Sequence, residues 1–295
     1  MRTAEQIQTV TVLGAGAMGA GIAQVVAQAG LHTRLYDIND EAVQRGYSGI
    51  EKMLAKGVER GKVGADDMTA TLGRITATSD LTASLEGSEL VIEAAPEKLE
   101  LKKAIFAQVA DVVAADAIVA SNTSSISIAA LAEADPHPER FLGLHFFNPP
   151  PLMPLLEIVH GPKTDAAVVD TCKQLSEQWG KSPIVVKDSP GFASSRLGVA
   201  LGLEAIRMVE EGIASPADID TAMELGYRHP MGPLKLTDMI GIDVRVNIAE
   251  YLASKLSDAR FEPPALMRQM VAEGKLGMKS GQGFYKWDGR KPVID

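Results

Sequence analysis

Short apolar runs alternate with longer amphipathic stretches through the first half of the chain. The runs are rich in β-branched residues and predict strands, whereas apolar positions at helical spacing predict helices. Strands separated by helices are typical of βαβ units, so we expect a mainly parallel sheet with helices on both faces. The predicted strands are residues 10–13, 33–36, 89–93, 117–121, 140–146, 154–159 and 184–187, and the predicted helices are residues 18–29, 41–60, 97–113 and 164–179.

The pattern changes after residue 187, where the sequence reads Asp-Ser-Pro-Gly. Beyond this point no segment predicts a strand, whereas Pro190, Pro216 and Pro263 each mark the start of a helix. Residues 192–209 are apolar around most of a helical circumference, so this helix must be buried in a bundle or against another subunit. We therefore predict an α/β domain at residues 1–187 and an all-α domain at residues 188–295 that helps to form a homodimer.

Length and composition fit two domains and exclude several classes of protein. A chain of 295 residues is long for one domain, and its 46% of hydrophobic residues suffice for a substantial core. The single cysteine, Cys172, excludes an internal disulfide framework and suits a reducing compartment. No apolar run reaches the roughly 20 residues that span a bilayer, and the N-terminal residues lead directly into a predicted strand. We therefore expect a cytoplasmic protein without a signal peptide.

The charge balance narrows the choice of partners. With 38 acidic and 29 basic residues, the chain has a formal net charge of −9. Such a protein repels polyanions, so we expect no nucleic acid and no membrane as a partner. An anionic small molecule remains compatible with this charge if a local basic cluster meets it. No metal site is predicted.

A glycine-rich turn between the first predicted strand and helix carries the strongest chemical signal. In the run from Gly14 through Gly16 and Met18 to Gly19, the first glycine permits a tight turn and the second lets the backbone approach a pyrophosphate. The third allows close helix packing, and the helix N-terminus attracts phosphate. Asp37, at the end of the second strand, would bind ribose hydroxyls and repel a 2′-phosphate, which favours NAD over NADP. The predicted fold is therefore Rossmann-like and doubly wound, with NAD bound at this turn. The alternatives to NAD are a flavin dinucleotide or a glycine-rich turn that binds no ligand.

Two polar residues interrupt apolar strands later in this domain. His145 lies near the carboxyl end of one predicted strand, and Glu157 lies within the next. Unpaired burial of such groups is costly, and the proline-rich turn between the strands would let the two side chains face each other. A catalytic pair of this kind would fix the imidazole tautomer and stabilise the imidazolium formed on proton abstraction. From the residue types alone, a structural His–Glu pair fits equally well.

Two further polar groupings have both a functional and an ordinary interpretation. Residues 121–125 (Ser-Asn-Thr-Ser-Ser) close another predicted strand, where such a cluster of hydroxyls and an amide can polarise a substrate oxygen, although such runs more often cap a helix. Lys52, Lys56 and Arg60 share one face of a predicted helix. That face is either an anion site or an ordinary solvated surface.

Motifs along nearly the whole chain resemble one known family. They are the glycine-rich turn with Asp37 and residues 91–97 (VIEAAPE), 121–125 (SNTSS), 143–149 (GLHFFNP), 188–192 (DSPGF), 229–233 (HPMGP) and 279–285 (KSGQGFY). In these motifs the chain resembles the L-3-hydroxyacyl-CoA dehydrogenase family, the bacterial 3-hydroxybutyryl-CoA dehydrogenases in particular. The resemblance implies an enzyme that interconverts (S)-3-hydroxyacyl-CoA, in particular the short-chain 3-hydroxybutyryl-CoA, and 3-ketoacyl-CoA with NAD(H), as in fatty acid metabolism.

The resemblance also implies roles for individual residues. His145 matches the general base, Glu157 its partner, and Ser124 the serine that binds the 3-oxygen of the substrate. The implied cofactor contacts are Gly14, Gly16, Met18, Gly19, Asp37, Glu97, Lys102, Asn148 and Lys279.

Further implied contacts hold the acyl-CoA substrate. In the family a basic helix binds the CoA phosphates; Lys56 matches one of its lysines, and Arg60 keeps the charge at a second position. The chain departs from the family at Ser195, where the family has an active-site asparagine. Serine is shorter and offers a single hydroxyl, so it would reach the substrate oxygen through a water molecule.

Two alternatives to this function differ in class. One is a dehydrogenase that acts on a free hydroxy acid. Lys56 and Arg60 favour a CoA ester over such a substrate, because their charges suit the CoA phosphates. The other is an NAD-binding structural or regulatory protein without catalysis, against which the presence of His145, Glu157 and Ser124 favours an enzyme.

Overall fold

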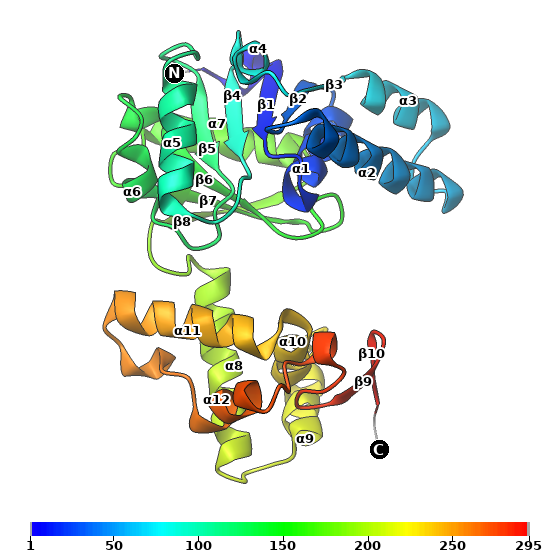
Figure 1. Cartoon of the computed structure of the whole chain (residues 1–295), viewed down its shortest axis with the longest axis vertical. Coiled ribbons are helices and arrows are strands. Elements are labelled where there is room, and N and C mark those ends of the chain that lie inside the picture. Colours follow the sequence, from blue (N-terminus) through cyan, green and yellow to red (C-terminus); the bar gives the residue numbers. More distant parts are fainter. Residues whose placement is uncertain (1, 294–295) are drawn as a thin grey trace. The chain divides into compact units, whose positions relative to one another are not determined.

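The computed structural model describes residues 2–293, which divide into two compact units (Figure 1). The first unit ends at Phe192, and the second begins at Ala193. Each unit has its own hydrophobic core. No helix in residues 2–293 is long and apolar enough to cross a bilayer.

The first unit is built on one sheet of eight strands in the order β3-β2-β1-β4-β5-β6-β7-β8. Neighbouring strands are parallel except for β6 and β7, which are antiparallel. The predicted mainly parallel sheet is confirmed. The strands are β1 (Thr9–Leu13), β2 (His32–Tyr36), β3 (Ile75–Thr78), β4 (Leu90–Glu93), β5 (Ile118–Ser121), β6 (Phe141–Phe146), β7 (Leu155–His160) and β8 (Ser182–Lys187).

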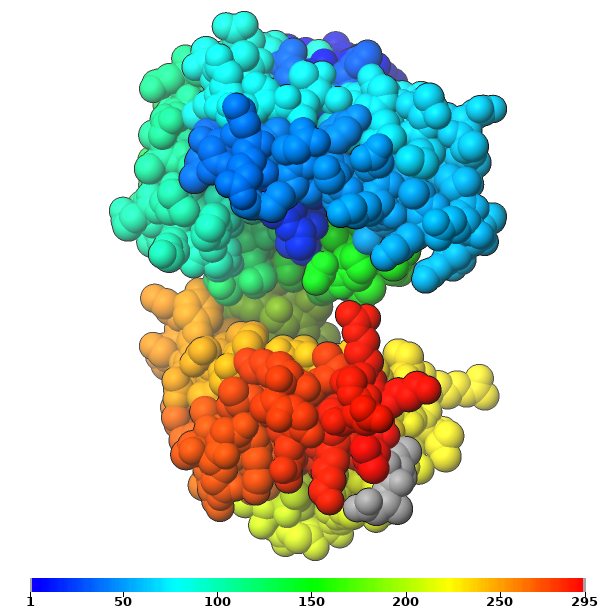
Figure 2. Space-filling model, turned by 45° about the vertical axis from the view of Figure 1, so that its right-hand side comes forward, coloured from blue at the N-terminus to red at the C-terminus, as the bar shows by residue number. Residues whose placement is uncertain are grey.

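Helices cover both faces of this sheet. Successive side chains of a strand point to opposite faces, so the buried strand residues contribute to two separate cores. On one face, Val10 and Val12 of β1 pack with α1, α2 and α7. On the other, Leu13 packs with α4, α5 and α6. The helices are α1 (Ala17–Gln28), α2 (Asp40–Glu59), α3 (Ala65–Gly73), α4 (Leu81–Leu85), α5 (Leu99–Ala110), α6 (Ile128–Ala132) and α7 (Ala166–Gln178), with short 3₁₀ turns at Ala4–Gln6 and Pro138–Arg140. In the space-filling view, α2 and α3 form the blue to light-blue surface of this unit (Figure 2).

The second unit is a helical bundle with a small terminal hairpin. Its helices are α8 (Ser194–Glu210), α9 (Pro216–Thr221), α10 (Pro233–Ile240), α11 (Ile242–Leu256) and α12 (Ala265–Ala272), with a π-helical turn at Ala222–Gly226 and 3₁₀ turns at Ala259–Phe261 and Met278–Ser280. The hairpin pairs β9 (Lys286–Asp288) with β10 (Lys291–Val293), so the expectation that this part has no strand was wrong at its end. Each of these strands has three residues, too few to establish an alternating pattern.

Helix α8 is less enclosed within the unit than its composition predicted. It buries Val199, Leu203 and Ile206 in the core of the second unit, whereas Leu197 is 71% exposed. One apolar face of the helix is therefore buried inside the bundle, and some apolar residues outside that face are exposed to solvent.

Candidate active site

The glycine-rich turn leaves backbone exposed at the start of α1. Gly14 has a φ of +105°, a conformation that side chains disfavour, and a Cβ on Gly19 would lie 1.7 Å from the Gly14 carbonyl oxygen. Gly16 is exposed and caps α1, and a Cβ on it would meet nothing within 4 Å. Open space over a helix N-terminus suits a pyrophosphate, so these residues fit a dinucleotide.

Asp37 lies directly beside this turn. Its Oδ2 accepts a hydrogen bond from the Ala15 backbone N–H at 2.7 Å, and its Oδ1 accepts one from the Ile38 N–H at 2.8 Å. The carboxylate is thereby fixed at the end of β2, next to the open turn. This is the position from which a carboxylate binds the hydroxyls of an adenosine ribose.

His145 and Glu157 form a hydrogen-bonded pair across β6 and β7. The two residues are directly opposite in the antiparallel register, and Nδ1 of His145 lies 2.7 Å from Oε2 of Glu157. Glu157 is completely buried, and His145 is 7% exposed. The rings of Phe147 and Phe192 lie against the imidazole, with centroids at 4.5 and 5.8 Å. With Nδ1 occupied by the carboxylate, Nε2 is the nitrogen left for other chemistry.

A cavity of about 330 Å³ opens beside the imidazole at the carboxyl edge of the sheet. It brings together several predicted site residues that are far apart in the sequence. Met18 comes from α1, Ser124 follows β5, and His145 and Asn148 come from the end of β6 and the segment after it. Its lining residues are Met18, Ala94, Ala95, Glu97, Lys102, Asn122, Ser124, His145, Phe146, Phe147 and Asn148.

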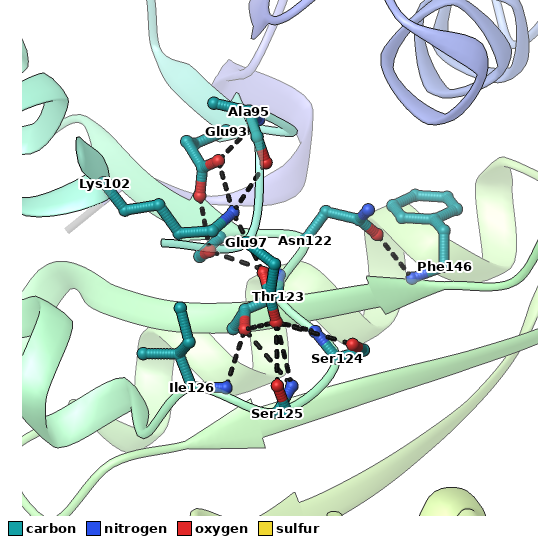
Figure 3. A network of polar contacts seen from close by, with 11 residues as sticks. Glu93, Ala95, Glu97, Lys102, Asn122, Thr123, Ser124, Ser125, Ile126 and Phe146 are labelled. Carbon is teal, nitrogen blue, oxygen red and sulfur yellow. Dashed lines mark hydrogen bonds and ion pairs between the residues drawn. The ribbon is translucent and has the colours of Figure 1, made fainter. Parts of the chain in front are cut away.

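Lys102 holds a buried ionic network behind this cavity (Figure 3). Its ammonium donates to Glu93 Oε1 at 2.6 Å and to the Ala95 carbonyl at 3.1 Å, and it lies 3.3 Å from Glu97 Oε2. Glu93 Oε2 accepts from the Ser121 hydroxyl at 2.6 Å. Lys102 is therefore engaged by the protein itself, although it also lines the cavity together with Glu97.

Glu97 shapes the loop that carries Ser124. Its Oε1 accepts hydrogen bonds from the Thr123 hydroxyl at 2.6 Å and from the backbone N–H groups of Ser124 and Ser125 at 3.0 and 3.1 Å. The cap of α6 is instead Ser127, whose hydroxyl accepts from the Ala130 N–H. Residues 121–125 thus bind a carboxylate and do not cap a helix.

Sequence reasoning singled out residues 91–97 and 121–125 but assigned no individual role to Glu93, Asn122 or Thr123. Asn122 accepts a hydrogen bond from the Phe146 backbone N–H at 2.8 Å and so ties the hydroxyl loop to the histidine strand. For Glu93, the sequence did contain a signal of a functional role, namely a carboxylate at the end of an otherwise apolar strand. The same observation pointed to Glu157.

The remaining predicted site residues lie on other elements. Lys56 and Arg60 are exposed at the end of α2, and neither has an ion pair within the described part of the chain. Lys279 and Ser195 belong to the second unit. Lys279 pairs with Asp243 at 2.5 Å, and Ser195 lies half-buried in the first turn of α8.

A nucleotide turn and a buried imidazole at one edge of the same sheet fit the class of NAD-dependent oxidoreductases, in which the protein positions a dinucleotide beside an acid–base group. Two family models match within that class: "3-hydroxyacyl-CoA dehydrogenase, NAD binding domain" over residues 9–189 and "3-hydroxyacyl-CoA dehydrogenase, C-terminal domain" over residues 191–287. The chain belongs to the 3-hydroxyacyl-CoA dehydrogenase family.

Individual relatives agree with this assignment. The chain is 45% identical to a probable 3-hydroxybutyryl-CoA dehydrogenase of Deinococcus radiodurans, covering 94% of this chain and 99% of the relative. It is 44% identical to the 3-hydroxyadipyl-CoA dehydrogenase of Escherichia coli, covering 98% of this chain but only 61% of that longer protein. The crystal structure of (S)-3-hydroxybutyryl-CoA dehydrogenase from Ralstonia eutropha matches with a TM-score of 0.92 and 42% identity, covering 96% of this chain and 99% of that one.

Proposed function

We propose that this enzyme oxidises the 3-hydroxyl of a short-chain (S)-3-hydroxyacyl-CoA, with His145 as general base and Glu157 as its partner. The observation that carries the proposal is the 2.7 Å contact between Nδ1 of His145 and the buried Glu157 carboxylate, beside a cavity that also contains Ser124. When Glu157 accepts a hydrogen bond from the Nδ1–H group, Nε2 carries the lone pair that a base needs.

The roles of the protein groups follow from their chemistry. When bound, NAD supplies the hydride acceptor for C3. His145 removes the hydroxyl proton, and the Glu157 carboxylate stabilises the imidazolium that results. Ser124 donates a hydrogen bond to the oxygen that becomes the ketone, and in the reverse reaction His145 returns the proton.

The cofactor contacts are assigned by the same proposal. The backbone at Gly14, Gly16 and Gly19 would bind the pyrophosphate and Asp37 the adenosine ribose. Supporting contacts would come from the other residues that the family resemblance implies, which are Met18, Glu97, Lys102, Asn148 and Lys279.

Substrate recognition would involve both ends of the thioester. Lys56 and Arg60 are exposed and have no ion pair within the described residues, so they are available to the CoA phosphates. Ser195, in place of the family asparagine, would reach the 3-oxygen through water. The short acyl chain is supported by relatives named 3-hydroxybutyryl-CoA dehydrogenase.

The helical domain is proposed to bind substrate and to join two subunits. Its predicted extent is residues 188–295, following a nucleotide domain at residues 1–187. Exposed apolar side chains on its helices, Leu236, Met239 and Ile240 of α10 among them, support a homodimer.

The function is tested by following the change in NADH concentration with three kinds of substrate. Acetoacetyl-CoA should be reduced, whereas free acetoacetate and hydroxy sugar acids (assayed in the oxidative direction with NAD) should give at most about a hundredth of its kcat/KM. Equal activity on acetoacetate would favour a free-acid dehydrogenase, and no activity on any substrate would favour a non-catalytic NAD-binding protein.

A further inference from the structure

Lys181 is a buried cation that the proposed chemistry does not use. It lies between α7 and β8, it is 8% exposed, and no carboxylate in residues 2–293 forms an ion pair with it. The other buried lysine of these residues, Lys102, is instead paired with Glu93 at 2.6 Å. Burial of a charge without a counter-ion is costly, and it lowers the pKa of Lys181 below its ordinary value of 10.5. The hydrogen bonds of this ammonium therefore have to offset the cost of its burial.

The ammonium of Lys181 binds the turn that joins β6 to β7. Its Nζ donates to the carbonyl oxygen of Pro150 at 2.5 Å and to that of Met153 at 2.9 Å. Residues 147–154 read Phe-Asn-Pro-Pro-Pro-Leu-Met-Pro, so half of them are prolines, which have no N–H group to donate. Two of the few N–H groups in the turn both bind the carbonyl of Pro149. The donors for the Pro150 and Met153 carbonyls therefore come from Lys181.

The same turn also lies against α1. A Cβ on Gly21 would come within 2.7 Å of Cδ of Pro150, so the turn packs closely on the backbone of the helix at this glycine. Met18 lies one helical turn earlier on the same side of α1. Asn148, at the beginning of the turn, lines the cavity together with Met18. Because the turn is held between Lys181 and α1, the place of Asn148 at the cavity depends on both contacts.

We propose that Lys181 is a positioning residue for cofactor binding: its two hydrogen bonds hold the turn after β6 so that Asn148 reaches the dinucleotide. This inference rests on the proposed function, in which Asn148 contacts NAD. His145 needs no such support, because its strand pairs directly with β7. Asn148 lies beyond the end of β6 and outside the strand pairing, so the turn decides where its side chain lies.

The dissociation constant for NADH, measured by fluorescence titration, tests this role. Lys181→Met removes both hydrogen bonds and should weaken NADH binding by about 5- to 50-fold, because two buried carbonyls lose their donor. Lys181→Arg should stay within about threefold of wild type, since a guanidinium can donate to both carbonyls. Lys173→Met, which removes an exposed lysine of α7, is the matched control and should leave the affinity unchanged.

A double variant separates positioning from general stabilisation of the fold. If Lys181 acts through Asn148, Lys181→Met should change NADH affinity by less than about twofold when residue 148 is already alanine. Gly21→Ala pushes the turn away from α1 while Lys181 is kept. It should weaken NADH binding in the wild type and have no further effect in Asn148→Ala, so it provides the same test if Lys181→Met does not fold.

Three results would overturn this inference. Wild-type NADH affinity in Lys181→Met, whatever its Tm, would mean that the lysine only stabilises the fold. Additive losses in the double variant would mean that it does not act through Asn148. Wild-type affinity in Asn148→Ala would remove the contact on which the inference rests. None of these results bears on the His–Glu chemistry, which fails instead if the wild-type enzyme binds NADH but reduces no CoA thioester.

Discussion

At the scale of single residues, Glu97 shows how the fold holds a carboxylate ionised beside the cavity. Burial alone would raise its pKa, but the hydrogen bond from Thr123 and the charge of Lys102 outweigh burial and hold the pKa below its ordinary value of 4.5. A lowered folded-state pKa means that the ionised form stabilises the fold. This stabilisation is present above about pH 4.5 and is lost as the pH falls through the lower folded value.

Glu97→Gln should therefore destabilise the protein in a pH-dependent manner. At pH 7 we expect a loss of about 1 kcal/mol, because the amide accepts the same hydrogen bonds without charge and the side chain is partly exposed. The difference in Tm between wild type and variant should shrink towards zero as the pH is lowered below 4.5. Thermal unfolding followed by circular dichroism from pH 3 to 7 measures it, and a difference that is constant with pH would contradict the ionisation described above.

Residue chemistry was predictable where a polar side chain interrupts an apolar strand. His145 and Glu157 were paired on this basis, and their register in β6 and β7 brings them together. Lys102 was expected to contact the cofactor, yet its main partner is Glu93, which was not identified. The sequence does not reveal this pair because it joins a strand to the following helix through tertiary packing.

At the scale of elements, strands and helices were predicted correctly where the apolar pattern extends over many residues. All seven predicted strands are present, with bounds within two residues of those observed. The strand β3 was missed because it is an edge strand of four residues with little burial, so it carries almost no apolar pattern. The short helices α3, α4 and α6 were missed likewise, since few turns give little periodic signal.

One glycine that no motif contains brings α2 against the nucleotide turn. A Cβ on Gly46 would lie 2.5 Å from the Ala15 carbonyl oxygen and 2.8 Å from the Ala15 Cβ. Ala15 belongs to the glycine-rich turn, and its N–H binds Asp37. The close packing of α2 therefore helps to fix the turn and the Asp37 carboxylate together.

Gly46→Ala should push α2 away from the turn and weaken NAD binding about tenfold, a loss of roughly 1.4 kcal/mol. Isothermal titration with NAD measures the change. Gly49→Ala on the same helix is the control, because a Cβ there meets nothing within 4 Å; it should leave affinity unchanged and stabilise the helix by up to about 1 kcal/mol. Equal NAD affinity in both variants would show that the Gly46 contact does not support the turn.

At the scale of the whole molecule, the second unit exposes several large apolar side chains to solvent. Leu236, Met239 and Ile240 have the spacing that puts them on one face of α10, and Val244 follows on α11. From the apolar residues 192–209, the sequence analysis predicted a helix that is buried in a bundle or against another subunit. The interior of the bundle buries one face of that helix. A contiguous apolar face of this kind typically belongs to a subunit interface.

A double variant, Leu236→Lys with Met239→Lys, should convert the proposed dimer into a monomer. Two charges placed in an apolar interface cost more than a typical dimer can tolerate. Light scattering after size-exclusion chromatography gives the mass. Ile38→Lys, at an exposed apolar position of the first unit, is the control and should remain a dimer. A wild-type mass of about 31 kDa would contradict the dimer outright.

The central claim is that an imidazole held by a buried carboxylate performs the proton transfer. The most direct measurement is kcat for acetoacetyl-CoA reduction by His145→Ala, alongside its dissociation constant for NADH. We predict a fall in kcat of about 10²- to 10⁴-fold, the usual contribution of general acid–base catalysis, with NADH affinity changed less than about threefold. A variant that keeps kcat within tenfold of wild type would contradict the role of His145.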